Sequence, residues 1–199
     1  MARILSKSIS SQIIFITFFF FSSSSAGVNG ASHNFRFSRI LLPQEMGLKQ
    51  EKITHFHFYF HEIVGGSNPT SEIVAGADPT DIMTTKFGTV RMMDIPLTET
   101  PDLTSKLVGR SQGIYASSSQ SEASYLMALD FVFMEGKHNG STLSILGRNP
   151  IFSGLREMSV VGGSGVFRFA RGYAQAKTHS LDPKAGHAIV EYNVFVIHY

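Results

Sequence analysis

The chain has 199 residues, of which 17 are Lys or Arg and 15 are Asp or Glu, so its formal net charge is +2. It contains no cysteine, which excludes a disulfide framework and a cysteine nucleophile. So small a net charge gives no electrostatic indication of binding to nucleic acid or to an anionic membrane. A chain of this length is expected to form one domain around a single hydrophobic core.

The first 26 residues have the organisation of a cleavable signal peptide. Arg3 and Lys7 form a basic start, an apolar run follows at 13–21, and Ser24 and Ala26 occupy the positions of a signal-peptidase site. The apolar run is too short for a membrane-spanning helix, which needs about 20 residues. We therefore expect cleavage near Ala26 and export, rather than an uncleaved membrane anchor, and a mature chain without formal net charge.

Residues 27–52 show no clear period and are expected to be a partly disordered lead segment. A period of two begins at residue 53, so we place the folded domain at 53–199. In the segment ITHFHFYFH, at 53–61, the phenylalanines fall on one face of a strand, and the histidines and the tyrosine fall on the other. The first strand therefore has one apolar face and one mixed face.

Further strand-like runs follow at short intervals to the end of the chain. Turn-forming residues separate them, and Asn139-Gly140 predicts a hairpin with a type I′ turn, which needs positive φ at both central residues. About eight strands and little helix indicate an all-β domain, either an up-and-down barrel or a sandwich. A barrel of eight strands is filled by side chains or holds one small ligand, and periodicity does not separate these cases. The predicted runs are 71–76, 87–95, 105–117, 124–135, 141–147, 157–161 with 166–178, and 187–198.

Common catalytic motifs are absent. There is no HExxH, no GxSxG and no GxxxxGK[ST], and the glycine-rich segment 162–165 is interpreted as a tight turn because no helix pattern follows it. His55, His57 and His61 share one face of the first strand, but alternate residues on a strand lie about 7 Å apart. We therefore predict no metal site there, and a solvated or subunit-facing strand face.

Charged residues within the strand patterns are the candidates for chemistry. A charge on a buried face is costly unless it is paired, so a carboxylate at a strand end that faces a cavity is often functional. Glu62, Asp94, Arg110 and Arg156 qualify, and the alternative for each is an exposed or ion-paired strand residue. One N-glycosylation sequon begins at Asn139, on the predicted hairpin tip.

Six blocks of the chain resemble consecutive parts of plant dirigent proteins, in the same order from about residue 55 to the C-terminus. The blocks are FHFYFHEIVGGSNPT, FGTVRMMDIPLT, SKLVGRSQGIYASSS, FVFMEGKHNGSTLSILGRNP, REMSVVGGSGVFRFARGYA and VEYNVFVIHY. The resemblance implies an eight-stranded antiparallel up-and-down β-barrel, as in allene oxide cyclases. It also implies a homo-oligomer, a dimer or trimer, in the plant apoplast.

The resemblance implies a phenolic substrate and no metal or organic cofactor. Dirigent proteins steer phenoxy radicals, such as those of coniferyl alcohol, into one stereochemical product, while a separate laccase or peroxidase carries out the oxidation. Related members act on quinone methides and close rings with loss of water, as in pterocarpan formation. A third hypothesis is a cell-wall binding protein without chemistry of its own.

Site residues follow from the resemblance position by position. Glu62 stands where the family usually has Asp, and Asp94 matches the first acid of its DDP motif. Tyr115 matches the tyrosine of the QGxY block, and Arg156 matches an arginine that faces the pocket in lignan-forming members. We assign proton transfer to Glu62 and Asp94 together with Arg156, and substrate contacts to Tyr115 and to the strand residue Arg110.

One departure from the family pattern bears on the substrate. Lignan-forming members have Gly-Ala-Asp where this chain has Gly147-Arg148-Asn149. An amide cannot act as a general acid or base, so Asn149 is expected to contact the substrate without assisting cyclisation. This GRN version resembles dirigents with unsettled substrates and those of the pterocarpan-forming type. Radical coupling remains the first functional hypothesis from the sequence, and dehydrating ring closure is the second.

Overall fold

The computed structural model describes residues 37–76 and 85–199. The predicted signal peptide at 1–26 therefore lies outside the described residues. Residues 37–51 contain no strand. Within the described ranges there is no α-helix, and no helix long and apolar enough to cross a membrane. The strands are β1 (Lys52–Ile63), β2 (Ser71–Ala75), β3 (Val90–Thr98), β4 (Leu107–Ser117), β5 (Ser124–Phe133), β6 (Thr142–Pro150), β7 (Arg156–Ser164), β8 (Arg171–Asp182) and β9 (His187–His198).

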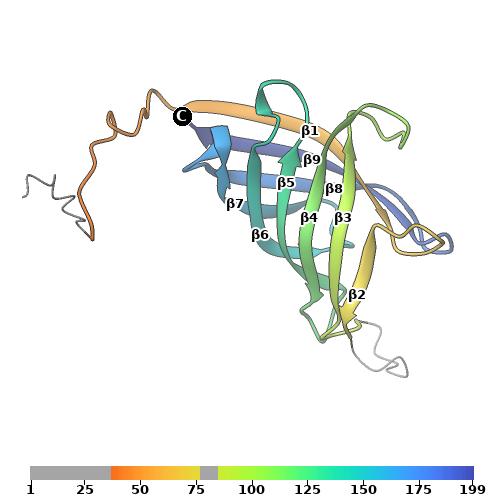
Figure 1. Cartoon of the computed structure of the whole chain (residues 1–199). Coiled ribbons are helices and arrows are strands. Elements are labelled where there is room, and N and C mark those ends of the chain that lie inside the picture. The colour runs from red at the N-terminus through yellow and green to blue at the C-terminus, as the bar shows by residue number, and fades with distance from the viewer. Residues whose placement is uncertain (1–36, 77–84) are drawn as a thin grey trace, which may run out of the picture. The chain divides into compact units, whose positions relative to one another are not determined.

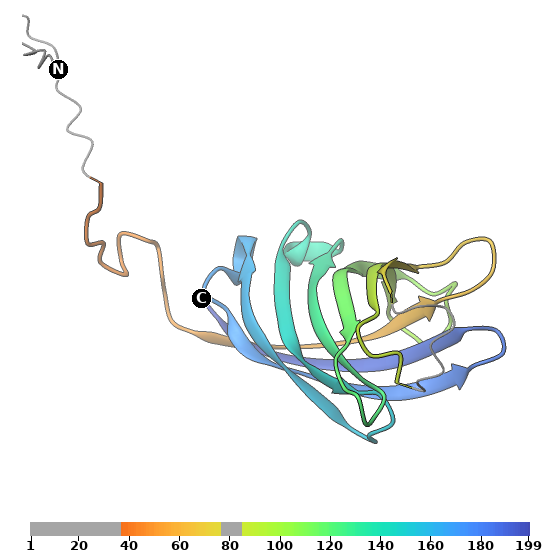
Figure 2. The same cartoon turned by 90° about the horizontal axis from the view of Figure 1, so that it is seen from below.

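The strands form one antiparallel sheet that closes on itself (Figure 1, Figure 2). Its order is β1-β9-β8-β7-β6-β5-β4-β3-β2, and a further pairing of β1 with β3 closes a ring of eight strands. β1 pairs with β3 only through Tyr59 and Phe60, and β2 covers the other end of β3 from Ser71 onward. The predicted eight-stranded antiparallel β-barrel is confirmed, with β2 as a ninth strand at its edge.

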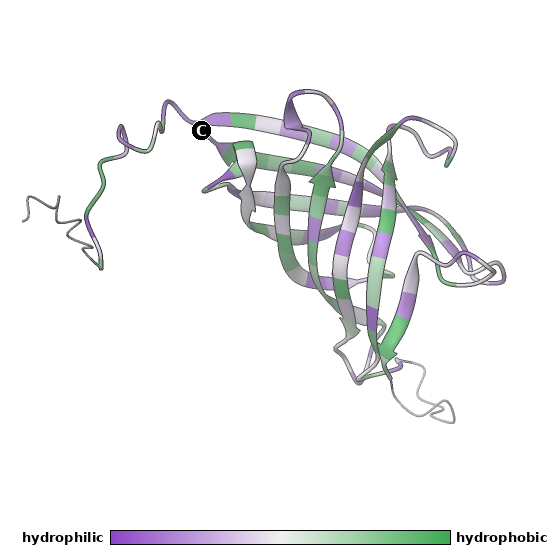
Figure 3. Ribbon diagram, in the orientation of Figure 1, coloured by the Kyte–Doolittle hydropathy of each residue, from purple (hydrophilic) through white to green (hydrophobic). Residues whose placement is uncertain are grey.

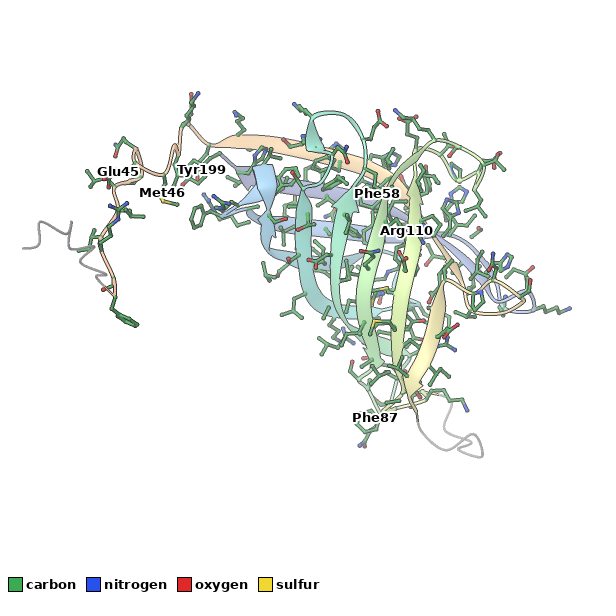
Figure 4. All side chains as sticks on the ribbon, in the orientation of Figure 1. Glu45, Met46, Phe58, Phe87, Arg110 and Tyr199 are labelled. Atoms are coloured by element: carbon green, nitrogen blue, oxygen red, sulfur yellow. The ribbon has the colours of Figure 1, made fainter. Side chains whose placement is uncertain are left out.

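Side-chain alternation fills the barrel. Most inward positions are apolar and the outward positions are mixed, and Figure 3 shows apolar and polar residues alternating along β3. Phe58 and Phe60 of β1 are buried as the period predicted, and Phe58 contacts the rings of Phe131 and Tyr192 with centroids 5.0 and 5.9 Å away. Figure 4 labels Phe58 among these side chains.

Aromatic rings close one end of the barrel. Phe56 from the start of β1 stacks on Phe133 at the end of β5, with ring centroids 4.5 Å apart. Phe167, in the 3-10 helix Gly165–Phe167, contacts Phe133 at 5.5 Å and His198 at 5.0 Å. Because this end is filled, space for a ligand remains only toward the other end of the lumen.

The predicted type I′ turn at Asn139-Gly140 is wrong. Asn139 has φ −52° and ψ 131°, while Gly140 has φ 77°, which is the geometry of a type II turn. The N–H of Ser141 donates to the carbonyl of His138 at 3.0 Å. The 3-10 helix Gly136–His138 precedes the turn and sets the direction in which the chain enters it, so positive φ is needed only at the glycine.

The interpretation of segment 162–165 as a tight turn also needs correction. β7 continues to Ser164, and β8 begins only at Arg171, so the predicted strand start at 166 is wrong. A Cβ on Gly163 would lie 2.4 Å from the carbonyl oxygen of Thr142 and 2.8 Å from Phe167. Gly163 is therefore a strand residue that allows close backbone packing, and the turn is formed by the residues after it.

His61 is not on a solvated face, contrary to the sequence prediction. It lies outside the lumen beside the β1–β3 closure, where it is 3% exposed and its Nε2 is 2.6 Å from Oγ1 of Thr98. Burial lowers the pKa of His61, against weaker opposing effects from the Thr100 carbonyl and the charge of Asp102. His55 and His57 are exposed, as expected for this face.

We predict that replacing Gly172 by Ala destabilises the barrel. Gly172 has φ 157°, and a Cβ there would lie 2.0 Å from the carbonyl oxygen of Phe195, which is fixed in the β8–β9 ladder. The expected loss in the free energy of unfolding is about 2–4 kcal/mol, from backbone strain and overpacking. Urea unfolding measures it. Gly162→Ala is the matched control, because its Cβ would meet no atom within 4 Å, and an equal loss there would contradict the prediction.

We predict that acid weakens the fold before its carboxylates titrate. The pKa of His61 and that of His138 are both lowered, chiefly by burial, so the unfolded chain binds more protons than the folded one near neutral pH. Stability is then complete above an unfolded histidine pKa of about 6.5 and is lost progressively as the pH falls below it. Urea unfolding from pH 8 to pH 5 measures this slope.

His61→Gln should make that slope shallower, and the same change at His179, exposed on β8, should leave it as in the wild type. Equal slopes in the two variants would show that burial of His61 does not couple folding to protons.

Candidate functional site

A cavity of about 280 Å³ lies at the end of the barrel opposite the aromatic cluster. In an antiparallel barrel this rim is formed by the ends of β1, β4, β6 and β8 and by the starts of β3, β5, β7 and β9. Segments distant in the sequence therefore bring side chains to one place. The inward polar residues of its wall are Glu62, Arg91, Tyr115, Tyr125, Asn149, Arg156, Thr178 and Tyr192.

Glu62 faces the lumen from the end of β1. Its Oε1 accepts hydrogen bonds from the hydroxyl groups of Tyr115 and Ser71, the latter at 3.0 Å. Burial, followed by the charge of Glu62, raises the pKa of Tyr115 far above its ordinary value, so this phenol stays protonated and donates. One carboxylate oxygen is thus held in place by two donors on β2 and β4, and the group is oriented for proton transfer in the cavity.

Arg156 contributes a buried positive charge from the start of β7. It is 3% exposed, and its Nη1 donates to the carbonyl of Ile151 at 3.0 Å and to Oγ1 of Thr178 at 2.6 Å. Burial lowers the pKa of Arg156, yet a guanidinium stays protonated at physiological pH. No carboxylate among the described residues pairs with Arg156, and its Nε has no partner there. This charge can therefore stabilise an anionic oxygen on a bound molecule.

Asn149 lines the same cavity from the end of β6. It is 7% exposed, and among the described residues its Oδ1 has no hydrogen-bond partner. It lies opposite Tyr125 of β5 in the β5–β6 register. A buried amide oxygen without a partner is a site for a ligand donor, because leaving it unpaired costs free energy.

Asp94 and Arg110 are not part of the cavity. Both lie on the outer face of the sheet, where Nε of Arg110, which Figure 4 labels, is 2.5 Å from Oδ1 of Asp94. Asp94 alternates with the buried residues Met93 and Ile95, so its side chain points away from the lumen. The expectation that Asp94 joins Glu62 and Arg156 in one site is not met, and Arg110 is an ion-paired strand residue.

A family model described as dirigent-like protein matches residues 53–197. The chain belongs to the dirigent family. Its relatives include a pterocarpan synthase of Glycyrrhiza echinata, 54% identical over 79% of this chain and 84% of that protein. They also include dirigent protein 1 of Arabidopsis thaliana, 50% identical over 76% of this chain and 82% of that protein.

Solved structures of dirigent proteins have the same fold. The pterocarpan synthase dirigent protein GePTS1 superimposes with a TM-score of 0.70 at 53% identity, over 76% of this chain and 87% of the other. The pterocarpan synthase dirigent protein PsPTS1 superimposes with a TM-score of 0.69 at 53% identity, over 76% and 99% of the two chains. The resemblance of the six sequence blocks to dirigent proteins is therefore confirmed.

Three cavity residues of this dirigent protein, and one residue that bonds to a cavity residue, were not predicted from its sequence. Ser71 bonds to Glu62, Thr178 bonds to Arg156, and Arg91 and Tyr125 line the wall. The period of two contains a signal for the last two, because Arg91 is in phase with Met93 and Tyr125 is in phase with Met127. Nothing local singles out Ser71 or Thr178, since their partners lie on distant strands.

The predicted glycosylation site and the possibility of a metal site remain to be compared with the structure. Asn139 is exposed in the β5–β6 connection, outside the cavity, where its predicted glycosylation stays a prediction. Among residues 37–76 and 85–199, no three His, Asp or Glu side chains are grouped so that they could hold a metal ion.

We predict that the buried charge of Arg156 lowers the free energy of unfolding. Replacing it by Met removes a buried charge without a counterion and should raise the free energy of unfolding by about 1 kcal/mol. Arg171→Met is the control, because Arg171 is exposed and pairs with Glu51 at 2.7 Å. Urea unfolding of both variants tests this. A loss of stability in Arg156→Met greater than that in Arg171→Met would show that Arg156 is a structural group.

Proposed function

We propose that this dirigent protein closes a ring on a single phenolic substrate with loss of water, through a quinone methide and without a cofactor. The carrying observation is that one cavity holds an oriented carboxylate, Glu62, and a guanidinium, Arg156, that has no counterion among the described residues, on strands separated by β9 and β8. Relatives of the same family support this reading. Those at 54% and 51% identity, from Glycyrrhiza echinata and Glycine max, are both named pterocarpan synthase.

Cavity size also favours one substrate molecule. The volume of about 280 Å³ lies just below the usual range for small-molecule pockets, about 300–1,000 Å³. One isoflavanol has two aromatic rings and brings both reacting groups into the cavity together. Intramolecular reaction then depends on holding one conformation, which a preformed pocket does well.

The chemistry balances without an oxidant. In the first step a benzylic hydroxyl takes a proton and leaves as water, while the phenol conjugated with it loses its proton and becomes the carbonyl of a quinone methide. In the second step a hydroxyl oxygen of the other ring bonds to the benzylic carbon and loses its proton, and the carbonyl regains one. The product equals the substrate minus one water.

The cavity residues have distinct roles in these steps. The guanidinium of Arg156, held by Thr178, stabilises the oxygen that alternates between phenolate and carbonyl. Glu62 carries the proton between the leaving and attacking oxygens, since a carboxylate oriented by Tyr115 and Ser71 can both accept and donate it. Asn149 orients a substrate hydroxyl without transferring its proton.

Stereoselective coupling of phenoxy radicals is the second candidate, with a laccase or peroxidase as the source of radicals. Its support is family membership and the apolar part of the cavity wall, where Phe60, Met127, Ile151 and Val190 offer faces for aromatic rings. This reaction joins two molecules, and a cavity for one ligand requires the second radical to approach from outside.

The proposed setting is extracellular, because the N-terminal sequence has the organisation of a signal peptide. We also propose a homo-oligomer. An apolar row crosses the outer face of β3, β4, β5 and β6 through Met92, Ile114, Ala128 and Leu146, which are paired in register, and three of these are exposed. A contiguous exposed apolar surface of this kind is typical of an interface.

The test is turnover of a 2′-hydroxyisoflavanol by the mature protein without any oxidant, followed by chiral chromatography. Wild-type protein should form one pterocarpan enantiomer, and Glu62→Gln should lower kcat by about 100-fold or more, the usual worth of a general acid or base. Glu72→Gln is the matched control, because Glu72 is exposed on the adjacent β2 and outside the cavity.

Full activity in Glu62→Gln would show that Glu62 does not transfer the proton. Product formation from coniferyl alcohol with defined handedness, seen only when an oxidase is added, would instead favour radical coupling.

A further inference from the structure

Arg91 is a second positive charge on the cavity wall. It stands near the start of β3, in phase with Met93, Ile95 and Leu97, whose side chains fill the barrel. Its side chain therefore faces the lumen, where it lines the same cavity as Glu62. An arginine at the beginning of an otherwise apolar inward face is not needed for packing.

The contacts of Arg91 leave most of its guanidinium available. Its Nη1 donates to the backbone carbonyl of Ser71 at 3.3 Å, and no carboxylate of the described residues lies within ion-pairing distance. Three arginines on the outer surface differ in this respect, because Arg110, Arg148 and Arg171 pair with Asp94, Glu122 and Glu51. The two cavity arginines therefore both lack a counterion within the part of the chain that the structure describes.

Arg91 lies on a different part of the wall from Arg156. It is opposite Tyr115 in the β3–β4 register, and the ring of Tyr115 is 5.0 Å from that of Tyr125. Burial, followed by the charge of Glu62, raises the pKa of both tyrosines, and the charge of Arg91 opposes this shift in each, so the guanidinium and the carboxylate both act on the two phenols. Arg156, by contrast, is bonded on the β7–β8 side of the lumen.

No acid among the described residues forms an ion pair with Arg91. Glu62 is bonded through its Oε1 to Tyr115 and Ser71. Asp182, at the rim, is exposed and its Oδ1 accepts the N–H groups of Lys184 and Ala185, both at 3.0 Å. A guanidinium partly removed from water and without a counterion is costly unless a ligand supplies the anion.

We propose that Arg91 is a specificity-determining residue that binds an ionised oxygen group of the substrate, a carboxylate or an acidic phenolate, at the end of the cavity away from Arg156. The planar fork of a guanidinium matches a carboxylate with two parallel hydrogen bonds. The substrate class is then a phenolic compound that carries an ionised oxygen group in addition to its reacting hydroxyls. This inference rests on the proposed function only in taking the cavity as the ligand site.

Two ligands that differ only in this group test the inference. Ferulate and coniferyl alcohol share one methoxyphenol ring and one propenyl chain, and end in a carboxylate and an alcohol. Titration calorimetry with the mature protein at pH 7 should give a ferulate Kd about tenfold lower, the usual worth of a hydrogen-bonded charge. Arg91→Gln should remove this preference by weakening ferulate alone, and Arg91→Lys should keep part of it.

Arg110→Gln is the matched control, since Arg110 lies on the outer face of the neighbouring strand and pairs with Asp94. It should leave both Kd values unchanged, and thermal melting should show that each variant is folded. An unchanged ratio of the two Kd values in folded Arg91→Gln would overturn the proposal, as would equal wild-type affinities. Either result would leave ring closure untouched, because that activity is measured separately through Glu62→Gln.

Discussion

Pairing of β1 with two neighbours is the constraint on which this structure depends. β1 is joined to β9 over its whole length and to β3 through Tyr59 and Phe60, and only the second contact turns a sheet into a barrel. His61 and Thr98 reinforce the closure with a buried contact of 2.6 Å. A shift of one residue in this register would turn Phe58, Phe60 and Glu62 out of the lumen together. The core and the site therefore both depend on the register of β1.

Closure also divides the lumen into a filled end and a hollow end. Large rings from Phe56, Phe133 and Phe167 meet at one end and leave no room for a ligand. At the other end the inward positions carry polar side chains that bond to the wall and leave about 280 Å³ free. A barrel of eight strands has little spare interior, so the choice of side chains at one rim decides whether a ligand enters.

The arginines of the cavity and those of the outer surface differ in whether a carboxylate pairs with them. Outside, Arg110 and Arg171 neutralise carboxylates at short distance and contribute little to stability because water screens them. Inside, Arg91 and Arg156 have hydrogen bonds to oxygen atoms of the chain but no counterion among the described residues. The apolar core supplies the stability that keeps these charges in place, and the substrate we propose completes their interactions. Stability and function are thus distributed over different ends of one barrel.

Local patterns in the sequence were enough to predict much of the fold and several cavity residues. Alternation placed Phe58 and Phe60 on one face of the first strand, and the six family blocks led to the barrel and to Glu62, Tyr115, Asn149 and Arg156. The same alternation, applied to Met93 and Ile95, would have put Asp94 outside and Arg91 inside. The match of Asp94 to a family acid predicted the opposite, and Arg91 was not predicted as a cavity residue. The predicted turn type at Asn139 was also wrong, because a 3-10 helix precedes that turn. The predicted end of β7 was wrong because Gly163 allows a close backbone approach within the strand.

By itself, then, the sequence determined the all-β barrel, the apolar inner face of the first strand and the family, since alternation and the family blocks are local features of the chain. Only the tertiary structure decided that Ser71 and Tyr115 hold Glu62, that Thr178 holds Arg156, and that Asp94 is paired outside. Those contacts join strands far apart in the chain. They follow from the register in which the barrel closes, which no local pattern contains.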